Sequence, residues 1–281
     1  MRKSLKLAPL LVLAVIAAGS LARAEVVVEP VPPHQSFTLE STKLKETRRI
    51  NVYLPPGYDA ATATRYPVLY MPDGGIKEDF PHIATTVDTA IRAGEMRPVL
   101  VVGIENTERR RDMTGPTEVA EDRKIAPRVG GSAAFRSFIR DELMPQVRSK
   151  YRVTDETAII GESLAGLFIV ETFFLQPKMF DTYIALSPSL WWNNDELPRK
   201  AAERLKAQPE MRNSLYLSAA NEEGIAPQTA RLAETLRKSA PAGLKWHFEP
   251  RPDLRHDNIY RSLAPQVLRK WFAPSATKST P

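Results

Sequence analysis

The segment TAIIGESLAGLFIV, residues 157–170, decides the fold of this chain. It begins with a short apolar run, passes through a tight turn that contains a serine, and ends in a long apolar run. This order is typical of a buried strand, a nucleophile elbow and a buried helix. An elbow leaves room only for small residues two positions before and after its serine, and Gly161 and Ala165 are both small. We therefore predict that Ser163 is a catalytic nucleophile, with a plain turn or helix cap as the alternative.

Strand and helix patterns alternate on both sides of this segment. Apolar or alternating stretches predict strands at residues 35–42, 47–54, 65–71, 98–104, 182–186, 213–218 and 244–248. Helices are predicted at residues 82–96, 131–151, 227–239 and 258–272. The first two strands alternate polar and apolar residues, which favours an antiparallel edge on a larger sheet. Strands that alternate with helices predict an α/β fold, with a mainly parallel, doubly wound sheet and helices on both faces.

The N-terminus has the pattern of a secretory leader. Residues 1–6 are basic, residues 7–18 are apolar, and residues 22–24 read Ala-Arg-Ala. The apolar run falls short of the roughly 20 residues that span a bilayer, so an uncleaved membrane anchor is the less favoured alternative. We predict a signal peptide at 1–24, one domain at 25–272 and a flexible tail at 273–281. The mature protein is then periplasmic or secreted, without stable membrane insertion.

The charge and the cysteine count exclude several classes of protein. The formal net charge is +6, but the leader holds four basic residues and no acid, so the remaining chain carries +2. A basic sequence pI is then no argument for a nucleic-acid partner. The chain has no cysteine, which excludes disulfides and a thiolate nucleophile or ligand. No His/Asp cluster has the spacing of metal ligands, so we expect no metal and no cofactor. The sequence predicts no oligomeric state.

A serine nucleophile needs a histidine base and an acid that orients the base. In a sheet of this kind, the base is expected after the last strand, downstream of Ser163. His34 and His82 lie upstream of the serine, and His247 lies on the polar face of a predicted strand. His256 follows the last predicted strand and precedes the last helix. We predict His256 as the base, with a loop residue that helps to cap the helix as the alternative.

The acid is expected in the loop AANEEG, residues 219–224, which lies between the serine and the histidine in the chain. Two adjacent carboxylates point in different directions, so at most one of them faces the imidazole. We favour Glu223 over Glu222. The alternative is that both are solvated loop charges, and that the site works without an acid or uses Asp253 or Asp257.

The tetrahedral oxyanion formed at an ester needs backbone N–H donors. One is expected from Leu164, directly after the nucleophile. The second is expected from Gly75, where the missing side chain lets the backbone approach a substrate. A plain tight turn is the alternative interpretation of this glycine.

Five stretches of the sequence occur in order within residues 35–272. They are RINVYLPPGY (49–58), RYPVLYMPDG (65–74), VGIENT (102–107) followed by residues 109–114, GESLAGLF (161–168) and SPSLWWN (187–193). Together they resemble the esterase D-like branch of the α/β-hydrolases, and within it the group of ferric-enterobactin and related siderophore esterases. This resemblance implies an α/β-hydrolase fold with Ser163 as nucleophile and His256 as base. It also implies an ester substrate, with a siderophore ester such as a ferric catecholate lactone as the first expectation and an aryl or small acyl ester as the next.

The chain departs from the family pattern beside both of these residues. Family members commonly have His-Ser and a following Gly-Gly at the elbow, where this chain has Glu162 and then Ala165-Gly166. The histidine of the family usually has Gly and Ser neighbours, where this chain has Arg255 and Asp257. These changes remove no catalytic atom and bear on substrate preference.

Two further features are candidates for substrate binding. Trp191 and Trp192 follow a strand on the rim that carries the serine, and their indoles suit an aromatic acyl group; packing under a loop is the alternative. Arg111 lies in a basic run and is a candidate partner for an anionic substrate, with an internal ion pair as the favoured alternative.

These features together predict a serine carboxylic-ester hydrolase that forms an acyl-enzyme on a small-molecule ester. The alternatives are a non-catalytic binding protein on the same fold, or a thioesterase or peptidase with the same machinery.

Overall fold

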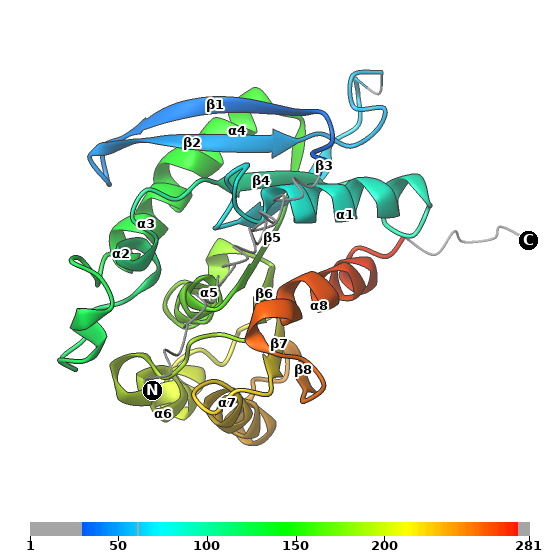
Figure 1. The fold of residues 1–281 in the computed structure, drawn as a ribbon. Coiled ribbons are helices and arrows are strands. Elements are labelled where there is room, and N and C mark those ends of the chain that lie inside the picture. The colour runs from blue at the N-terminus through cyan, green and yellow to red at the C-terminus, as the bar shows by residue number, and fades with distance from the viewer. Residues whose placement is uncertain (1–29, 61, 275–281) are drawn as a thin grey trace, which may run out of the picture.

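The computed structural model describes residues 30–60 and 62–274 (Figure 1). The predicted leader at 1–24 and most of the predicted tail lie outside the described residues. Within the described part of the chain, no helix has both the length and the apolar character needed to cross a membrane.

A sheet of eight strands runs through the middle of the molecule, in the spatial order β1-β2-β4-β3-β5-β6-β7-β8 (Figure 1). The strands are β1 (His34–Ser41), β2 (Glu46–Tyr53), β3 (Tyr66–Met71), β4 (Leu100–Ile104), β5 (Val153–Glu162), β6 (Thr182–Leu186), β7 (Ser214–Ala220) and β8 (Lys245–Arg251). β1 pairs antiparallel with β2, and β2 pairs antiparallel with β4. The other neighbours pair in parallel. This confirms the predicted parallel sheet with an antiparallel edge.

Helices cover both faces of the sheet (Figure 1). They are α1 (Phe80–Arg92), α2 (Arg109–Met113), α3 (Ser132–Phe138), α4 (Met144–Lys150), α5 (Leu164–Leu175), α6 (Trp192–Lys206), α7 (Ala226–Ser239) and α8 (His256–Trp271). A π-helical turn, η2 (Ile139–Leu143), joins α3 to α4, and short 3₁₀ turns lie at η1 (Asp122–Lys124) and η3 (Pro177–Met179). Residues of α1 and α8 share one buried core, and residues of α3, α4, α5, α6 and α7 share the other.

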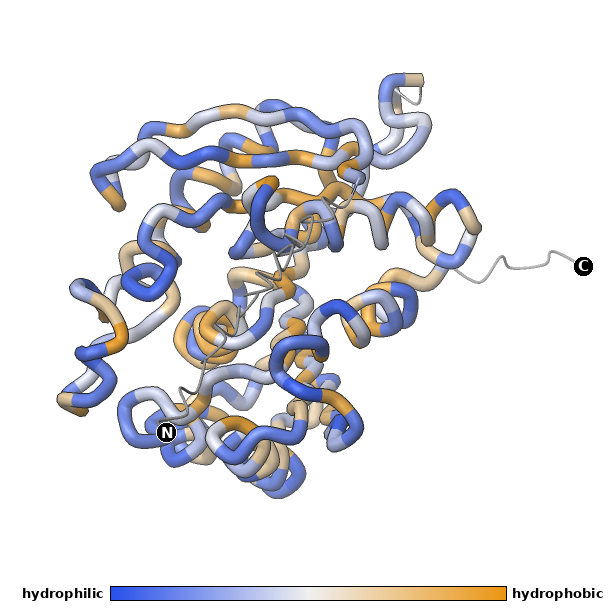
Figure 2. Tube along the Cα trace, viewed as in Figure 1, coloured by the Kyte–Doolittle hydropathy of each residue, from blue (hydrophilic) through white to orange (hydrophobic). Residues whose placement is uncertain are grey.

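The helix α5 packs in the interior and has no continuous polar face; its one charged residue, Glu171, pairs with Arg136. Ten of its twelve residues are buried, which matches a helix without a polar face. Figure 2 shows hydrophobic residues gathered on the central strands and α5, and hydrophilic residues on the outer helices. Each fully buried large apolar side chain contributes about 1.5–3 kcal/mol to folding, so this helix anchors the elbow firmly.

The sequence did not predict the helix α6. Its start at Trp192 is followed by Asn193, Asn194 and Asp195, whose φ angles of 49°, 56° and 57° lie in the left-handed region. A proline, Pro198, then falls inside the helix. Asparagine, aspartate and proline are residues of turns rather than helix interiors, so the composition conceals the regular turns that follow.

The parallel strands bring six connections to the same edge of the sheet. The carboxyl ends of β3, β4, β5, β6, β7 and β8 lie at that edge, because parallel strands run in one direction. The elbow follows the central strand β5, and the loops after β7 and β8 carry the candidate acid and base. Residues far apart in the sequence therefore meet there.

Candidate active site

Ser163 occupies the turn between β5 and α5. Its backbone angles, φ 60° and ψ −120°, are ones that a residue with a side chain rarely adopts. Its N–H donates to the Leu186 carbonyl at 3.1 Å, which helps to hold this conformation. Strand and helix approach closely here, because a Cβ on Gly161 would lie 2.7 Å from the Cβ of Ala165. Only the pairing of glycine with a small residue lets the chain turn here, as the sequence predicted.

His256 is the first residue of α8 and lies against Ser163. Its Nε2 is 3.0 Å from Ser163 Oγ, within a hydrogen bond. Its Nδ1 is 2.8 Å from Glu222 Oε2. This second contact has the distance of a hydrogen bond without the alignment, a state common in unliganded sites. A carboxylate at Nδ1 favours the tautomer with the proton on Nδ1, which leaves Nε2 able to accept the serine proton.

Glu222, and not Glu223, faces the imidazole of His256. The chain turns directly after Glu222, whose carbonyl accepts the N–H groups of Ile225 at 3.2 Å and Ala226 at 2.9 Å. This turn directs the Glu222 side chain toward His256, while Glu223 is exposed. The sequence favoured Glu223 as the acid that faces the imidazole, whereas the structure places Glu222 there.

The other acids considered for this role have partners elsewhere. Asp253 forms an ion pair with Arg251, with atoms 2.8 Å apart. Asp257 pairs with Arg255 at 3.3 Å. Both pairs lie on the connection between β8 and α8 and at the start of α8, beside the histidine rather than against it.

A second carboxyl group, that of Glu162, contacts the other ring nitrogen. Glu162 Oε1 is 3.1 Å from His256 Nε2, and 17% of its side chain is exposed. Burial raises the pKa of Glu162 from 4.5 to about 8. The charge of Arg109 lowers this pKa, and the carboxyl groups of Asp73 and Asp79 raise it. The residue before the nucleophile therefore carries a proton near neutral pH.

The two predicted oxyanion donors differ in their surroundings. Leu164 is the first residue of α5, so its N–H has no acceptor within the helix and lies next to Ser163. The Gly75 N–H donates to Glu78 Oε2 at 2.7 Å. Gly75 can serve a substrate oxygen only if Glu78 moves away. Leu164 is the donor that the geometry favours.

The loop after β3, which contains Gly74 and Gly75, is fixed by a clamp on Asp73. The Asp73 carboxylate accepts two hydrogen bonds from Arg109, at 2.6 and 2.8 Å, and one from Asn106 at 2.6 Å. The Gly74 carbonyl accepts a hydrogen bond from Asn51 Nδ2 at 2.8 Å. Arg109 is thus engaged in holding this loop beside the elbow.

The two tryptophans have different positions. Trp192 is buried, and its indole Nε1 donates to the Gly115 carbonyl at 2.9 Å, so it packs as an anchor under the neighbouring loop. Trp191 is only partly buried, and its Cδ1 lies 4.0 Å from the position of a Cβ on Gly224. It therefore borders the loop that carries Glu222. Of the two tryptophans, only Trp191 keeps a position suited to substrate binding.

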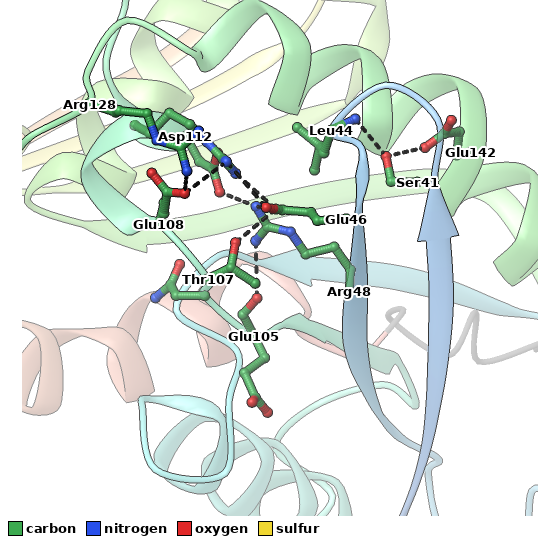
Figure 3. A network of polar contacts seen from close by, with 12 residues as sticks. Ser41, Leu44, Glu46, Arg48, Glu105, Thr107, Glu108, Asp112, Arg128 and Glu142 are labelled. Carbon is green, nitrogen blue, oxygen red and sulfur yellow. Dashed lines mark hydrogen bonds and ion pairs between the residues drawn. The ribbon is translucent and has the colours of Figure 1, made fainter.

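Arg111 lies in an internal polar network rather than facing a substrate. Its guanidinium contacts Glu46 at 2.8 Å, Asp112 at 2.7 Å and Glu108 at 3.3 Å. Figure 3 shows Glu46, Asp112 and Glu108 close to one another in this network, together with the buried Arg48. Internal ion pairing was the favoured alternative, and the contacts agree with it.

Sequence reasoning missed two neighbours of the nucleophile. The contact of Glu162 with His256 is one, and Ser189 Oγ, 3.4 Å from Ser163 Oγ, is the other. The elbow pattern marked Glu162 as a departure from the family without indicating where its side chain points. Ser189 lies in the family-like stretch SPSLWWN (187–193), but nothing in that stretch indicates a contact with the nucleophile. In the described ranges, no group of three or more His, Asp or Glu side chains is arranged to hold a metal ion.

Comparison with known proteins assigns the family. Residues 41–248 match the profile of the family described as "Putative esterase". The chain belongs to this esterase family. The match covers β2 to β7 and most of β8, and it contains Ser163 and Glu222.

Relatives of this esterase chain include siderophore esterases. Ferri-bacillibactin esterase BesA of Bacillus subtilis is 28% identical over 191 residues, which are 59% of this chain and 64% of BesA. Siderophore triacetylfusarinine C esterase of Aspergillus fumigatus is 28% identical over 182 residues, 59% of each protein. The chain thus spans less than two thirds of either curated relative.

The fold of this family member is that of solved α/β-hydrolases. An IroE-like serine hydrolase from Shewanella oneidensis superimposes with a TM-score of 0.76 at 28% identity, over 85% of this chain and 80% of that one. The similarity confirms the predicted α/β-hydrolase fold.

Proposed function

We propose that this protein is a serine carboxylic-ester hydrolase that acts through an acyl-enzyme. The observation that carries the proposal is the line of contacts from Ser163 Oγ through both nitrogens of His256 to Glu222. These three groups follow one another in the chain in the order serine, acid, histidine, each after a parallel strand of the same sheet. Family membership supports the same activity.

The first half of the reaction transfers the acyl group to Ser163. Its Oγ attacks the ester carbonyl while His256 Nε2 takes the hydroxyl proton, and Glu222 stabilises the imidazolium from Nδ1. The Leu164 N–H donates to the oxyanion of the tetrahedral intermediate. Collapse of this intermediate breaks the bond to the leaving alcohol, which receives the proton from Nε2.

The second half returns the enzyme to its starting state. Water attacks the acyl-enzyme carbonyl, gives its proton to His256 Nε2, and forms a second tetrahedral intermediate. Its collapse releases the carboxylic acid and returns the proton to Ser163 Oγ. No step needs a metal or a redox partner.

For the substrate, we propose a siderophore ester, with an aryl or other small acyl ester as the next class. The printed names of BesA and the fungal relative support this choice. Trp191, beside the acid loop, supplies an aromatic surface that fits an aryl group. We assign no anion-binding role to Arg111 or Arg109, because both are paired with carboxylates within the chain.

We also propose that the protein is exported, with the mature chain beginning at Glu25. The basic and apolar segments of the leader carry this proposal. Intact-mass measurement of protein from a bacterial periplasmic fraction is expected to give the mass of residues 25–281. The mass of the full chain would contradict cleavage.

The enzyme proposal is tested with a fluorophosphonate probe, which reacts with activated serines. We expect wild type to be labelled and Ser163→Ala to be unlabelled, with hydrolysis lowered by at least about a thousandfold. Ser214→Ala is a matched control, because Ser214 begins β7 and so lies at the end of the strand away from the site. This variant should keep both the labelling and the hydrolysis of wild type. Labelling that survives Ser163→Ala would contradict the assignment of the nucleophile, and an unlabelled wild type would favour a binding protein.

A substrate panel separates the enzymes that share this machinery. Siderophore, aryl and small acyl esters are compared with a thioester and an amide at equal concentration. We expect the largest kcat/KM on an oxygen ester. A larger value for the thioester or the amide would instead identify a thioesterase or a peptidase.

A further inference from the structure

Two oxygen atoms converge on the ring nitrogen that must take the serine proton. Ser163 Oγ lies 3.0 Å from His256 Nε2, and Glu162 Oε1 lies 3.1 Å from the same nitrogen. Only the serine is aligned for a hydrogen bond, and Glu162 Oε1 is buried without one. Nε2 offers a single in-plane direction for a hydrogen bond, and Ser163 Oγ occupies it. The carboxyl oxygen of Glu162 therefore lies to one side of that direction.

We propose that Glu162 is a positioning residue that acts through His256. Its ionised carboxylate stabilises the protonated imidazole ring of His256 from the Nε2 side. The inference rests on the proposed function, because it requires His256 to be the base. It assigns a role to one of the residues at which this chain departs from the family pattern.

The geometry gives this carboxyl an effect that Glu222 cannot supply. Glu222 contacts Nδ1, which keeps its proton throughout the reaction. Glu162 contacts Nε2, which gains a proton as Ser163 attacks and loses it to the leaving group. A carboxylate at this nitrogen attracts the new proton and lowers the energy of the imidazolium in the transition state.

The charge of Glu162 depends on its surroundings on several elements. Burial raises its pKa to about 8. The groups that face it are Arg109 at the start of α2, Asp73 and Asp79 in the connection from β3 to α1, Glu222 after β7, and His256 and Tyr260 on α8. Arg109 lowers the pKa, and the three carboxylates raise it. Glu162 is therefore mainly neutral at pH 7 and mainly ionised above pH 8.

Two protonation states of the enzyme should consequently turn over at different rates. Below pH 8 the neutral carboxyl adds no charge at Nε2. Above pH 8 the carboxylate assists proton transfer from Ser163, so kcat/KM should rise as the pH passes through about 8. Glutamine has the shape of the neutral acid and cannot ionise, so it reproduces only the slower state.

The experiment compares pH profiles of kcat/KM for wild type and Glu162→Gln on one neutral aryl ester. We expect the two rates to agree within about twofold near pH 6.5 and wild type to exceed the variant by about tenfold near pH 9.5. Glu162→Asp, which keeps a carboxylate on a shorter side chain, should recover part of the rise. It also provides a second reading if the glutamine variant does not fold.

Asp155→Asn is the matched control, because it removes one carboxylate from the exposed beginning of the same strand β5. Its profile should follow wild type. A ratio of wild type to Glu162→Gln that is constant with pH, or that falls above pH 8, would overturn the proposal in favour of a purely structural residue. Failure of the enzyme proposal is distinguished by Ser163→Ala, which would then keep the hydrolysis measured in wild type.

Discussion

Glu222 and Glu223 are consecutive in the chain, and of these two residues only Glu222 contacts the imidazole of His256. Glu222 Oε2 is 2.8 Å from His256 Nδ1, and Glu223 is exposed. A carboxylate at Nδ1 both fixes the tautomer of the ring and stabilises its protonated form. An amide at the same place does neither reliably, because its NH₂ group can face the ring and favour the wrong tautomer.

We therefore expect Glu222→Gln to lower kcat by at least about a hundredfold, while Glu223→Gln stays within about twofold of wild type. Steady-state hydrolysis of an aryl ester measures both, and thermal unfolding shows whether both variants are folded. If Glu223→Gln were the slow variant, the acid of the site would be Glu223, as the sequence alone had suggested.

The individual residues of the site differ in how well the sequence alone could place them. Ser163 and His256 could be placed together because one lies in a strand–turn–helix pattern and the other follows the last strand, which fixes their edge of the sheet. The choice between two consecutive glutamates depends on a backbone turn after Glu222, which no spacing encodes. The contact of the Glu162 side chain with His256 joins residues 94 positions apart in the chain, and the elbow pattern does not encode it.

At the scale of elements, the loop after β3 is shaped by how closely it approaches β4. The Gly74 N–H donates to the Ile104 carbonyl at 2.9 Å, and a Cβ on Gly74 would lie 2.1 Å from the Ile104 nitrogen. The obstacle is backbone, which cannot move aside as a flexible side chain can. The missing side chain thus lets the loop run against the sheet beside the elbow.

Replacing Gly74 with alanine should lower the free energy of unfolding by about 3 kcal/mol or more. Gly224→Ala is the matched control, because the nearest atom to its added Cβ is 4.0 Å away, and it should change stability by less than about 1 kcal/mol. Urea denaturation of both proteins measures the difference. Equal stabilities would show that the loop can withdraw from β4 without cost.

The strands and helices that are most completely buried were the ones that the sequence predicted best, because burial requires long apolar segments. The run at β4 is buried along its whole length, and α5 has ten buried residues of twelve, so both have long apolar segments. The helix α6 begins with a buried tryptophan, then three polar residues in left-handed conformation, and contains a proline. Its tertiary contacts override the local preferences, which is why the sequence pattern did not reveal it.

At the scale of the whole molecule, a buried ion network joins the hairpin formed by β1 and β2 to the connection after β4. Arg48 on β2 has a fully buried side chain and pairs with Glu46, 2.6 Å away, and with Asp112 of α2. Figure 3 shows these groups between the hairpin and the neighbouring loop. Breaking one partner of a buried pair is costly because the remaining charge stays buried. The network therefore holds the antiparallel strands β1 and β2 against the connection after β4, which carries Arg109 into the site.

Glu46 makes the strength of this network depend on pH. Burial acts to raise its pKa, but hydrogen bonds from Arg111 and Thr107 and the charge of Arg48 outweigh it, and the pKa falls from 4.5 to about 2. A carboxyl whose pKa is lower in the folded state stabilises the fold above the unfolded value. This contribution is complete above about pH 4.5 and is lost as the pH falls toward 2.

We expect Glu46→Gln to lower the free energy of unfolding by about 2 kcal/mol at pH 7, with the gap to wild type closing between about pH 4.5 and 2. Urea denaturation at a series of pH values measures the gap. Glu210→Gln, which removes an exposed partner of Arg212, should change stability by less than about 0.5 kcal/mol at pH 7. A gap that stayed constant from pH 7 down to pH 2 would mean that Glu46 supports the hairpin through its shape and packing, because a contribution from its charge must disappear once the carboxylate is protonated.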